Sequence, residues 1–263
     1  MLHYARQAQT ANRLAPRQTR SAVGTAAIRG KYSPSARFWL HPDGAPVASS
    51  TAVAAVRDWS GRDISLSQAT ASKQPLAAAR EGIPCFTFDG VNDALQVGAI
   101  NLTTTQAITV AIVEFRPVAN VGVVWEFGTD INLGGGSFGT FVNDNGQCFS
   151  TAYASGPQFQ FRAVASTIGQ WRAWVVTANR AAIAANQLYV YTQGMQVTSF
   201  VNSGSGTVTG SFGNFASWVG SRNNGAAFPF NGSVAQVLLL DRALSTSDAA
   251  TLSLEIAQAA GVA

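Results

Sequence analysis

Acidic side chains are the first residues to consider as catalysts in this sequence of 263 residues. Hydrolysis of a glycosidic bond uses two carboxyl groups about 5–9.5 Å apart, and acids at positions i and i+2 of a β-strand would face the same side. The acid groupings here are Asp89 with Asp93, Glu126 with Asp130, and the isolated Asp144. No grouping places two acids at positions i and i+2 of a strand. The pattern around Glu126 indicates the end of a strand. The sequence therefore argues against a glycosidase.

The residue types also argue against nucleophilic catalysis and zinc binding. The chain has two histidines, His3 and His41, both near the N-terminus, so the remainder offers no Ser–His–Asp or Cys–His arrangement. Cys85 and Cys148 are far apart in strand-like runs, which predicts buried free thiols rather than zinc ligands. A disulfide between them would need an oxidising compartment. We predict no catalytic residue, cofactor or metal.

Tryptophan side chains could instead stack on sugar rings. The chain has 6 Trp, and most tryptophans of a β-sandwich pack in the core or between the sheets. Trp171 and Trp174 are an odd number of positions apart, so on a regular strand they face opposite sides. One of them is expected to face outward, and the pair is the candidate contact for a glycan.

Charge is distributed unevenly along the chain. Residues 1–42 hold seven basic residues and no acidic one, whereas residues 43–263 hold 10 basic and 13 acidic residues. The formal charges are thus +7 and −3. We interpret residues 1–36 as a basic, extended N-terminal arm and residues 37–263 as one domain. The basic side chains expected to dock on a partner are Arg6, Arg13, Arg17, Arg20, Arg29 and Lys31.

Four interpretations of the arm stay open: a solvated terminus, a segment that becomes ordered on a protein partner, a nucleic-acid-binding tail, and an organelle-targeting peptide. Nucleic acid is disfavoured as a partner, because aromatic residues that stack on bases are nearly absent. A secretory signal is not expected, since residues 1–14 lack an apolar core. No apolar run approaches the ~18–20 residues of a membrane span, so no membrane partner is expected either.

The domain must be built mainly from strands. Between residues 38 and 241, short β-branched and aromatic runs alternate with Gly, Asn, Asp, Ser and Pro clusters, which is typical of an antiparallel sandwich. Asn143–Gly146 and Gln193–Gly194 have the residues that tight hairpin turns need. Before the second turn, Tyr189 and Tyr191 are expected on one face of a strand and the residues between them on the other.

The C-terminus has a helical pattern. Ser245 is a suitable N-cap with Asp248 three residues on, Leu252 and Ile256 form an apolar stripe, and Gly261 is a suitable stop. This spacing predicts one short helix, which we expect to cover an edge of the sandwich.

Several segments resemble the laminin-G-like domains of the concanavalin A-like superfamily. They are Asp58–Gly61, Phe86–Gly90 with Asp93, Trp218–Ser221, Phe230–Val237, and Leu240–Ser245 with the Asp248 helix. The ending follows the family pattern of a glycine, an F-x-G motif, a strand that ends in R-x-L-S, and a short helix. The resemblance covers about residues 37–260. It implies an all-β fold, a two-sheet antiparallel jelly-roll sandwich with one short C-terminal helix.

The resemblance also raises the question of calcium, which laminin-G-like domains often bind at the rim of a sheet. The candidate ligands are Asp130 with Asn132, or Asp144 with Asn143 and Asn145. Ca²⁺ takes 6–8 oxygen ligands, and neither set supplies several carboxylates. We therefore interpret both sets as turn-forming residues.

The combination of a basic arm and a jelly roll is typical of a virion protein that is made in the host cytoplasm without a signal peptide. Only 11% of the residues are charged, which suits a surface packed against other subunits, and laminin-G-like modules occur in bacteriophage head-decoration and tail proteins. We expect a non-enzymatic phage structural protein, homo-oligomeric and docked on capsid or tail subunits. The alternative is a carbohydrate-binding module that recognises host-surface glycans.

Overall fold

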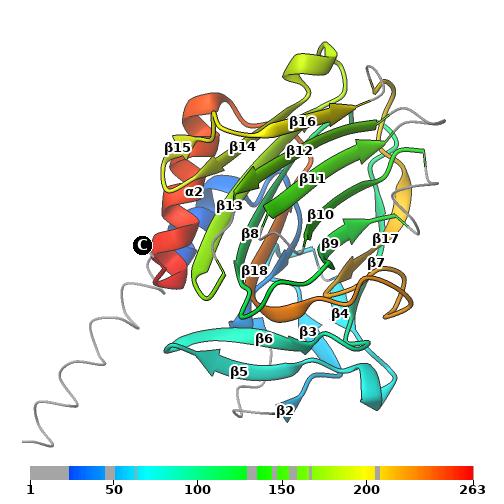
Figure 1. Ribbon diagram of the computed structural model, residues 1–263, viewed down its shortest axis with the longest axis vertical. Helices are drawn as coiled ribbons and strands as arrows, with labels where there is room; N and C mark the ends of the chain where they lie inside the picture. Colours follow the sequence, from blue (N-terminus) through cyan, green and yellow to red (C-terminus); the bar gives the residue numbers. More distant parts are fainter. Residues whose placement is uncertain are drawn as a thin grey trace, which may run out of the picture.

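The computed structural model describes residues 24–44, 51–62, 64–128, 135–143, 147–153, 159–165, 168–204 and 208–262. In this part of the chain the strands form two antiparallel sheets of nine strands each (Figure 1). The two sheets and the C-terminal helix confirm the predicted all-β, two-sheet jelly-roll sandwich.

Sheet A contains β1 (Ala36–Leu40), β2 (Thr51–Ala52), β5 (Leu76–Arg80), β6 (Ile83–Asp89), β8 (Ala107–Phe115), β13 (Trp171–Asn179), β14 (Leu188–Thr192), β15 (Met195–Gln196) and β18 (Asn231–Leu240). Sheet B contains β3 (Ala55–Arg57), β4 (Ser65–Ser67), β7 (Leu95–Asn101), β9 (Gly122–Phe127), β10 (Phe138–Val142), β11 (Gln147–Tyr153), β12 (Phe159–Ala165), β16 (Val201–Gly204) and β17 (Asn214–Val219). Short 3₁₀ helices are η1 (Pro42–Gly44), η2 (Ala71–Lys73) and η3 (Ala184–Asn186), and the C-terminal helix is α2 (Thr246–Ala260).

The central strands of sheet A are buried on both faces. In β18, Val237 and Leu239 join the core between the two sheets, whereas Leu238 and Leu240 join a second apolar cluster on the outer face of sheet A. A strand with two buried faces has no polar alternation. This explains why residues 237–240 form a continuous apolar run.

The predicted hairpin at Gln193–Gly194 is confirmed. Both residues have positive φ, 50° and 80°, and they join β14 to β15. Tyr189 and Tyr191 pack in the outer cluster, whereas Leu188 and Val190 point between the sheets, as the alternation predicts. The turn predicted at Asn143–Gly146 falls on residues 144–146, outside the described residues.

Helix α2 has the predicted caps, and it covers more of sheet A than the predicted edge. The Ser245 side chain accepts a hydrogen bond from the backbone N–H of Asp248 at 3.2 Å, and Gly261 ends the helix at φ 77°. The helix reaches the edge strand β15, beside which Ser253 Oγ accepts from the backbone N–H of Gly194 at 2.9 Å, but it does not stop at this edge. It lies across the outer face of sheet A, against β8, β13 and β14 (Figure 1), because those strands present a second apolar face that must be shielded from water.

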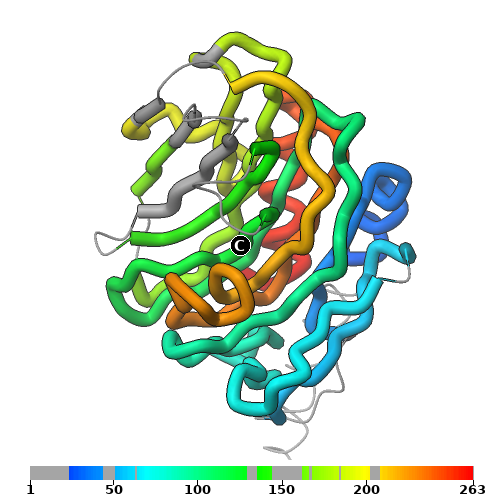
Figure 2. The backbone as a smooth tube through the Cα atoms, turned by 90° about the vertical axis from the view of Figure 1, so that its right-hand side faces the viewer, coloured from blue at the N-terminus to red at the C-terminus, as the bar shows by residue number. Residues whose placement is uncertain are grey.

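The predicted extended arm, residues 1–36, is wrong in its last part. Residues 24–32 are helical, and Ile28 and Tyr32 are each 1% exposed in the outer cluster beside α2. These residues are the dark-blue start of the coloured tube in Figure 2. Lys31 pairs with Glu255 at 3.8 Å, and Arg29 lies over the Trp59 ring. The folded domain therefore includes residues from Gly24 onward, since two large apolar side chains anchor them. The other candidate docking residues, Arg6, Arg13, Arg17 and Arg20, lie outside the described residues.

Candidate functional site

The loop that joins β17 to β18 has a strained backbone. Asn223, Asn224 and Phe228 adopt positive φ values of 44°, 58° and 49°, a region that L-residues rarely occupy. The loop is held in place by a hydrogen bond from Lys73 Nζ to the carbonyl oxygen of Asn224, at 2.8 Å. Phe228 nevertheless stays 42% exposed. Such strain persists only where surrounding contacts impose it, and it is concentrated at functional sites.

A buried ion pair lies at the base of this loop. Arg222 Nε donates to Glu126 Oε1 at 3.1 Å and to Oε2 at 3.3 Å, and Glu126 is 0% exposed. Trp218 is the cross-strand partner of Glu126 and is itself 6% exposed. The Arg222 guanidinium also lies 4.8 Å from the centre of the Phe228 ring. Glu126 is thus shielded from water and is not placed to protonate a ligand, whereas Phe228 offers an exposed ring supported by a cation.

The acid grouping at Asp89 and Asp93 closes a turn. Asp93 Oδ2 accepts from the backbone N–H of Asp89 at 2.9 Å, and Asp89 Oδ1 accepts from the N–H of Val91 at 2.8 Å. Burial raises the pKa of Asp93 to about 6, and the negative charge of Asp89 adds to the shift. These carboxylates therefore hold a turn after β6. Asp130, the predicted neighbour of Glu126, lies outside the described residues.

We expect the stability difference between wild type and Asp93→Asn to depend on pH. The pKa of Asp93 is raised from 3.8 to about 6 in the folded protein, so between these values the folded state binds more protons than the unfolded state. Wild-type stability relative to Asp93→Asn should then fall as the pH rises through this window, by at most about 3 kcal/mol. Urea unfolding of both proteins at pH 4, 5, 6 and 7 measures this difference in the free energy of unfolding. A stability difference that does not change with pH would contradict the raised pKa of Asp93.

A second buried carboxylate, Glu114, could not be recognised from the sequence pattern. It lies in β8, where it is 2% exposed and accepts from the Trp174 indole N–H at 3.1 Å. Burial raises the pKa of Glu114, and Arg116 and Arg172 act in the opposite direction. The chain gives no local signal for this arrangement, because Trp174 and Glu114 belong to different strands.

The tryptophan pair predicted to contact glycan lies on β13, and the expectation that its members face opposite sides is confirmed. Trp174 and Trp171 do face opposite sides of β13, since Trp174 joins the core between the sheets and Trp171 packs against the outer cluster. Trp174 is 4% exposed and offers no ring face for stacking. Trp171 is half-buried, with its ring 5.6 Å from that of Phe115. Trp171 faces outward from sheet A but is partly shielded, because α2 and the helical residues 24–32 cover the outer face of that sheet.

Residues 89–250 match the family described as the concanavalin A-like lectin/glucanases superfamily. This match covers more than half of the chain. The chain belongs to this superfamily. No curated protein matches it.

Solved structures with the same fold include binding domains and an enzyme. The botulinum neurotoxin serotype G binding domain aligns at a TM-score of 0.57 and 9% identity, over 77% of this chain and 50% of that one. Botulinum neurotoxin type C, whose cell entry depends on interaction with two ganglioside molecules, aligns at 0.59 and 12% identity, over 85% and 52%. Trypanosoma rangeli sialidase in complex with sialic acid aligns at 0.56 and 18% identity, over 86% and 34%. The chain thus spans between a third and about half of these proteins, and the likeness is one of fold.

The described residues of this superfamily member bring together no three His, Cys, Asp or Glu side chains that could hold a metal ion. Of the calcium candidates, Asp130, Asn132, Asp144 and Asn145 lie outside the described residues. Asn143 is described, and its carbonyl oxygen accepts from Arg116 Nη1 at 2.9 Å.

Cys85 is a free thiol, 2% exposed, and burial raises its pKa. The side chain of Cys148 is outside the described part. Among the described residues there is no helix with the length and apolar character needed to cross a membrane.

Proposed function

We propose that the chain is a non-enzymatic structural protein of a bacteriophage virion, a head-decoration or tail-associated subunit. Its basic N-terminal segment would dock on neighbouring subunits while the sandwich is displayed outward. Its partners would be capsid or tail subunits and further copies of the chain. Three carboxylates lie on the described strands, and Asp89, at the end of β6, accepts from the backbone N–H of Val91 in the turn that follows. The observation that carries the non-enzymatic part is the burial of the other two, Glu114 and Glu126. One is held by Trp174 and the other by Arg222, so neither faces a substrate.

The docking part rests on charge and on where the folded domain begins. Residues 1–42 carry +7, but Arg29 and Lys31 are engaged with the domain itself, through Trp59 and Glu255. Of the six candidate docking residues, Arg6, Arg13, Arg17 and Arg20 therefore remain for the proposed partner. Their side chains are long enough to pair with acidic groups of a neighbouring subunit, and each such pair is strengthened when the interface excludes water.

The experiment compares two truncations. Removing residues 1–23 should abolish incorporation into particles assembled in the producing host, whereas the melting temperature of the purified domain should stay within about 2 °C of the wild-type value. Removing residues 1–35 also deletes Ile28 and Tyr32 from the outer cluster. That loss should cost more than about 3 kcal/mol, a shift of roughly 10 °C.

The matched control for the docking residues is a charge change on the domain. Full-length protein with Arg6, Arg13, Arg17 and Arg20 changed to Gln should fail to incorporate, whereas Arg57→Gln with Arg242→Gln, at two exposed sites of the domain, should incorporate normally. Normal incorporation of the 1–23 truncation or of the four-residue variant would disprove the docking proposal.

A second candidate function is glycan binding through the β17–β18 loop. It is favoured by the exposed Phe228 ring, which is backed by Arg222 and held by a strained backbone. Aromatic rings stack on the apolar faces of sugars, and such contacts are lost when the ring is removed. On a glycan array, Phe228→Ala should reduce the signal of any bound glycan about tenfold or more. Leu254→Ala, which alters an apolar residue of similar exposure on helix α2, should leave the signal unchanged, and equal effects would contradict the assignment.

A further inference from the structure

Exposed apolar side chains gather at one end of the sandwich. Of the ten large apolar side chains that are exposed among the described residues, five belong to four loops at this end. They are Val91, Val118, Val121, Ile168 and Phe228, each 40–67% exposed. Soluble monomers seldom gather apolar side chains in one exposed area unless that area binds a partner. We call this surface the loop end.

Strand pairing brings the four loops together. The loops are residues 90–92, 117–121, 168–170 and 223–230. The strands beside them pair at the ends that adjoin the loops: β6 with β18 from Asp89 and Asn231 onward, and β8 with β13 from Phe115 and Trp171 onward. Because β18 also pairs with β8, these strand ends lie side by side.

Backbone hydrogen bonds connect the loops to their neighbours. The N–H of Val123, which follows the β8–β9 loop, donates to the carbonyl oxygen of Phe228 at 2.8 Å. The N–H of Gly169 donates to the carbonyl oxygen of Arg116, also at 2.8 Å. The five apolar side chains therefore belong to one surface rather than to separate loops.

The β17–β18 loop is held in one shape by its own contacts. The carbonyl oxygen of Asn224 accepts from Lys73 Nζ, and the N–H of Gly225 donates to Ser221 Oγ, both at 2.8 Å. A Cβ added to Gly225 would lie 2.2 Å from the carbonyl oxygen of Asn92, so the loop also packs closely on the β6–β7 turn. A surface that is already ordered loses little conformational entropy when it binds.

The loop end carries no charge at its centre. The four loops contain no Asp, Glu, Lys, Arg or His. Partners that are recognised through charge gain little from such a surface, which argues against the arginine-rich N-terminal segment, nucleic acid and an anionic membrane. Charged side chains of both signs border the loops, and both bind loop backbone: Asp89 accepts from the N–H of Val91, and Lys73 donates to the carbonyl oxygen of Asn224.

The folded domain as a whole has no net charge. The chain holds 17 basic and 13 acidic residues, and four of the arginines precede Gly24. From Gly24 onward, 13 basic residues balance 13 acidic residues. Two copies of the domain can therefore approach each other without net repulsion, and proteins with a net charge near zero tend to associate.

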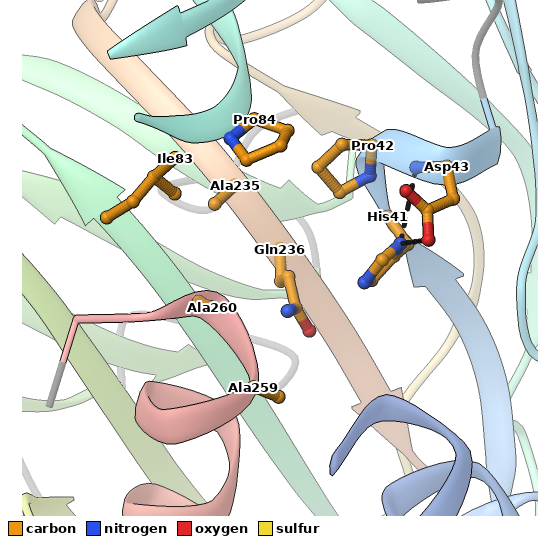
Figure 3. A pocket seen from close by; sticks show the side chains of 9 residues that line it. All are labelled: His41, Pro42, Asp43, Ile83, Pro84, Ala235, Gln236, Ala259 and Ala260. Atoms are coloured by element: carbon orange, nitrogen blue, oxygen red, sulfur yellow. Dashed lines mark hydrogen bonds and ion pairs between the residues drawn. The ribbon is translucent and has the colours of Figure 1, made fainter. Parts of the chain in front are cut away.

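The hollow beside His41 is a weaker place for a partner to anchor. It lies on the outer face of sheet A, between β6, β18 and the C-terminal end of α2 (Figure 3). Its volume is about 40 Å³, well below the cavity that holds a benzene ring, so it cannot receive a large side chain. Asp43 also brings a charge to its lining. The loop end is thus the better candidate for a protein contact.

We propose that the loop end is the contact between two copies of this chain, which pack face to face about a two-fold axis. A two-fold contact uses the same surface on both molecules, so that surface must be complementary to itself. The loop end meets this requirement, because its apolar side chains can pack against their copies and its loops bring no like charges together. The proposal deepens the function proposed above, which names further copies of the chain as partners, and it rests on that part of it. The dimer buries Phe228 and so excludes a glycan at this loop.

Analytical ultracentrifugation of the full-length chain tests the contact. Between about 1 and 200 µM the wild-type protein should change from monomer to dimer, with a Kd in the micromolar range. Val118→Asp and Phe228→Asp should each raise this Kd about tenfold or more, because a carboxylate would be buried between the copies without a partner. Val118→Ser, which removes apolar surface without adding charge, should weaken the dimer in the same direction.

Leu254→Asp is the matched control. Leu254 is 40% exposed, close to Val118 at 46% and Phe228 at 42%, but it lies on α2. Its replacement should leave the Kd within about twofold of the wild-type value. Thermal unfolding of all variants should stay within about 2 °C of the wild type, so that a lost dimer reports on the contact rather than on the fold. A wild-type chain that stays monomeric, or equal weakening by Leu254→Asp, would overturn the proposal.

Two further measurements separate this contact from docking by the basic N-terminal segment. An apolar contact depends little on salt, so the Kd should stay within about twofold between about 50 and 500 mM NaCl. Full-length protein with Arg6, Arg13, Arg17 and Arg20 changed to Gln should form the dimer like the wild type. A dimer that is lost in salt or in this variant would show that the N-terminal segment joins the copies, and it would overturn the loop-end contact. Sedimentation with phosphatidylcholine vesicles in place of dimer formation would overturn it as well. The docking proposal is decided separately, by incorporation into particles.

Discussion

Replacing Arg222 by alanine should lower the free energy of unfolding by about 3–5 kcal/mol, because it leaves the carboxylate of Glu126 buried without its cation. Glu126 is 0% exposed, and both of its oxygens accept from Arg222 Nε, at 3.1 and 3.3 Å. A carboxylate in this position cannot recover its hydration without opening sheet B. Urea unfolding followed by tryptophan fluorescence at pH 7 measures the change.

Arg242→Ala is the matched control, because Arg242 is exposed, and its replacement should change the stability by less than about 0.5 kcal/mol. Adding Glu126→Gln to Arg222→Ala should recover part of the loss, since the buried group then carries no charge. If Arg222→Ala costs no more than Arg242→Ala, the ion pair does not stabilise the fold and the account of this loop is wrong.

Replacing Gly220 by alanine should cost more than about 3 kcal/mol, the second large effect expected from the structure. Gly220 has φ 89°, and a Cβ atom added to it would overlap the Phe88 ring at Cδ1 and Cε1. Phe88 is 1% exposed in the core between the sheets and has little room to move. The substitution therefore adds steric overlap in the core to the backbone strain of a positive φ.

Gly210→Ala separates these two causes. Gly210 has a similar φ of 80°, but an added Cβ would meet no atom within 4 Å. Its replacement should cost about 1–2 kcal/mol, from the backbone alone. Thermal unfolding of both variants measures the difference, and equal losses would show that the Phe88 ring shifts away without cost. Glycine is thus required at position 220 of the Trp218–Ser221 segment for packing rather than for ligand binding.

The ion pair between Arg222 and Glu126 and the packing of His41 show which contacts the sequence leaves undefined. Glu126 carries no signal that distinguishes it from any other acid at a strand end, because its partner Arg222 is 96 positions away. Gln236 and His41 come together only when β18 pairs with β1, through Val237 and Leu40. The sequence places Trp171 and Trp174 on opposite faces but does not say which is inside, and the structure shows that Trp174 donates to Glu114 inside the sandwich.

The sequence by itself determined the features that depend on near neighbours in the chain. The alternation of Tyr189 and Tyr191, the cap at Ser245, the stop at Gly261 and the turn at Gln193–Gly194 follow from strand and helix periodicity and from the few residues that tolerate positive φ. Only the tertiary structure decided that α2 covers the outer face of sheet A and that the domain extends back to Gly24. It also decided that the side chains of Glu126 and Glu114 are buried. The physical reason is that burial and charge pairing depend on which strands become neighbours. That choice is made by the packing of two whole sheets and their helices, not by any short segment.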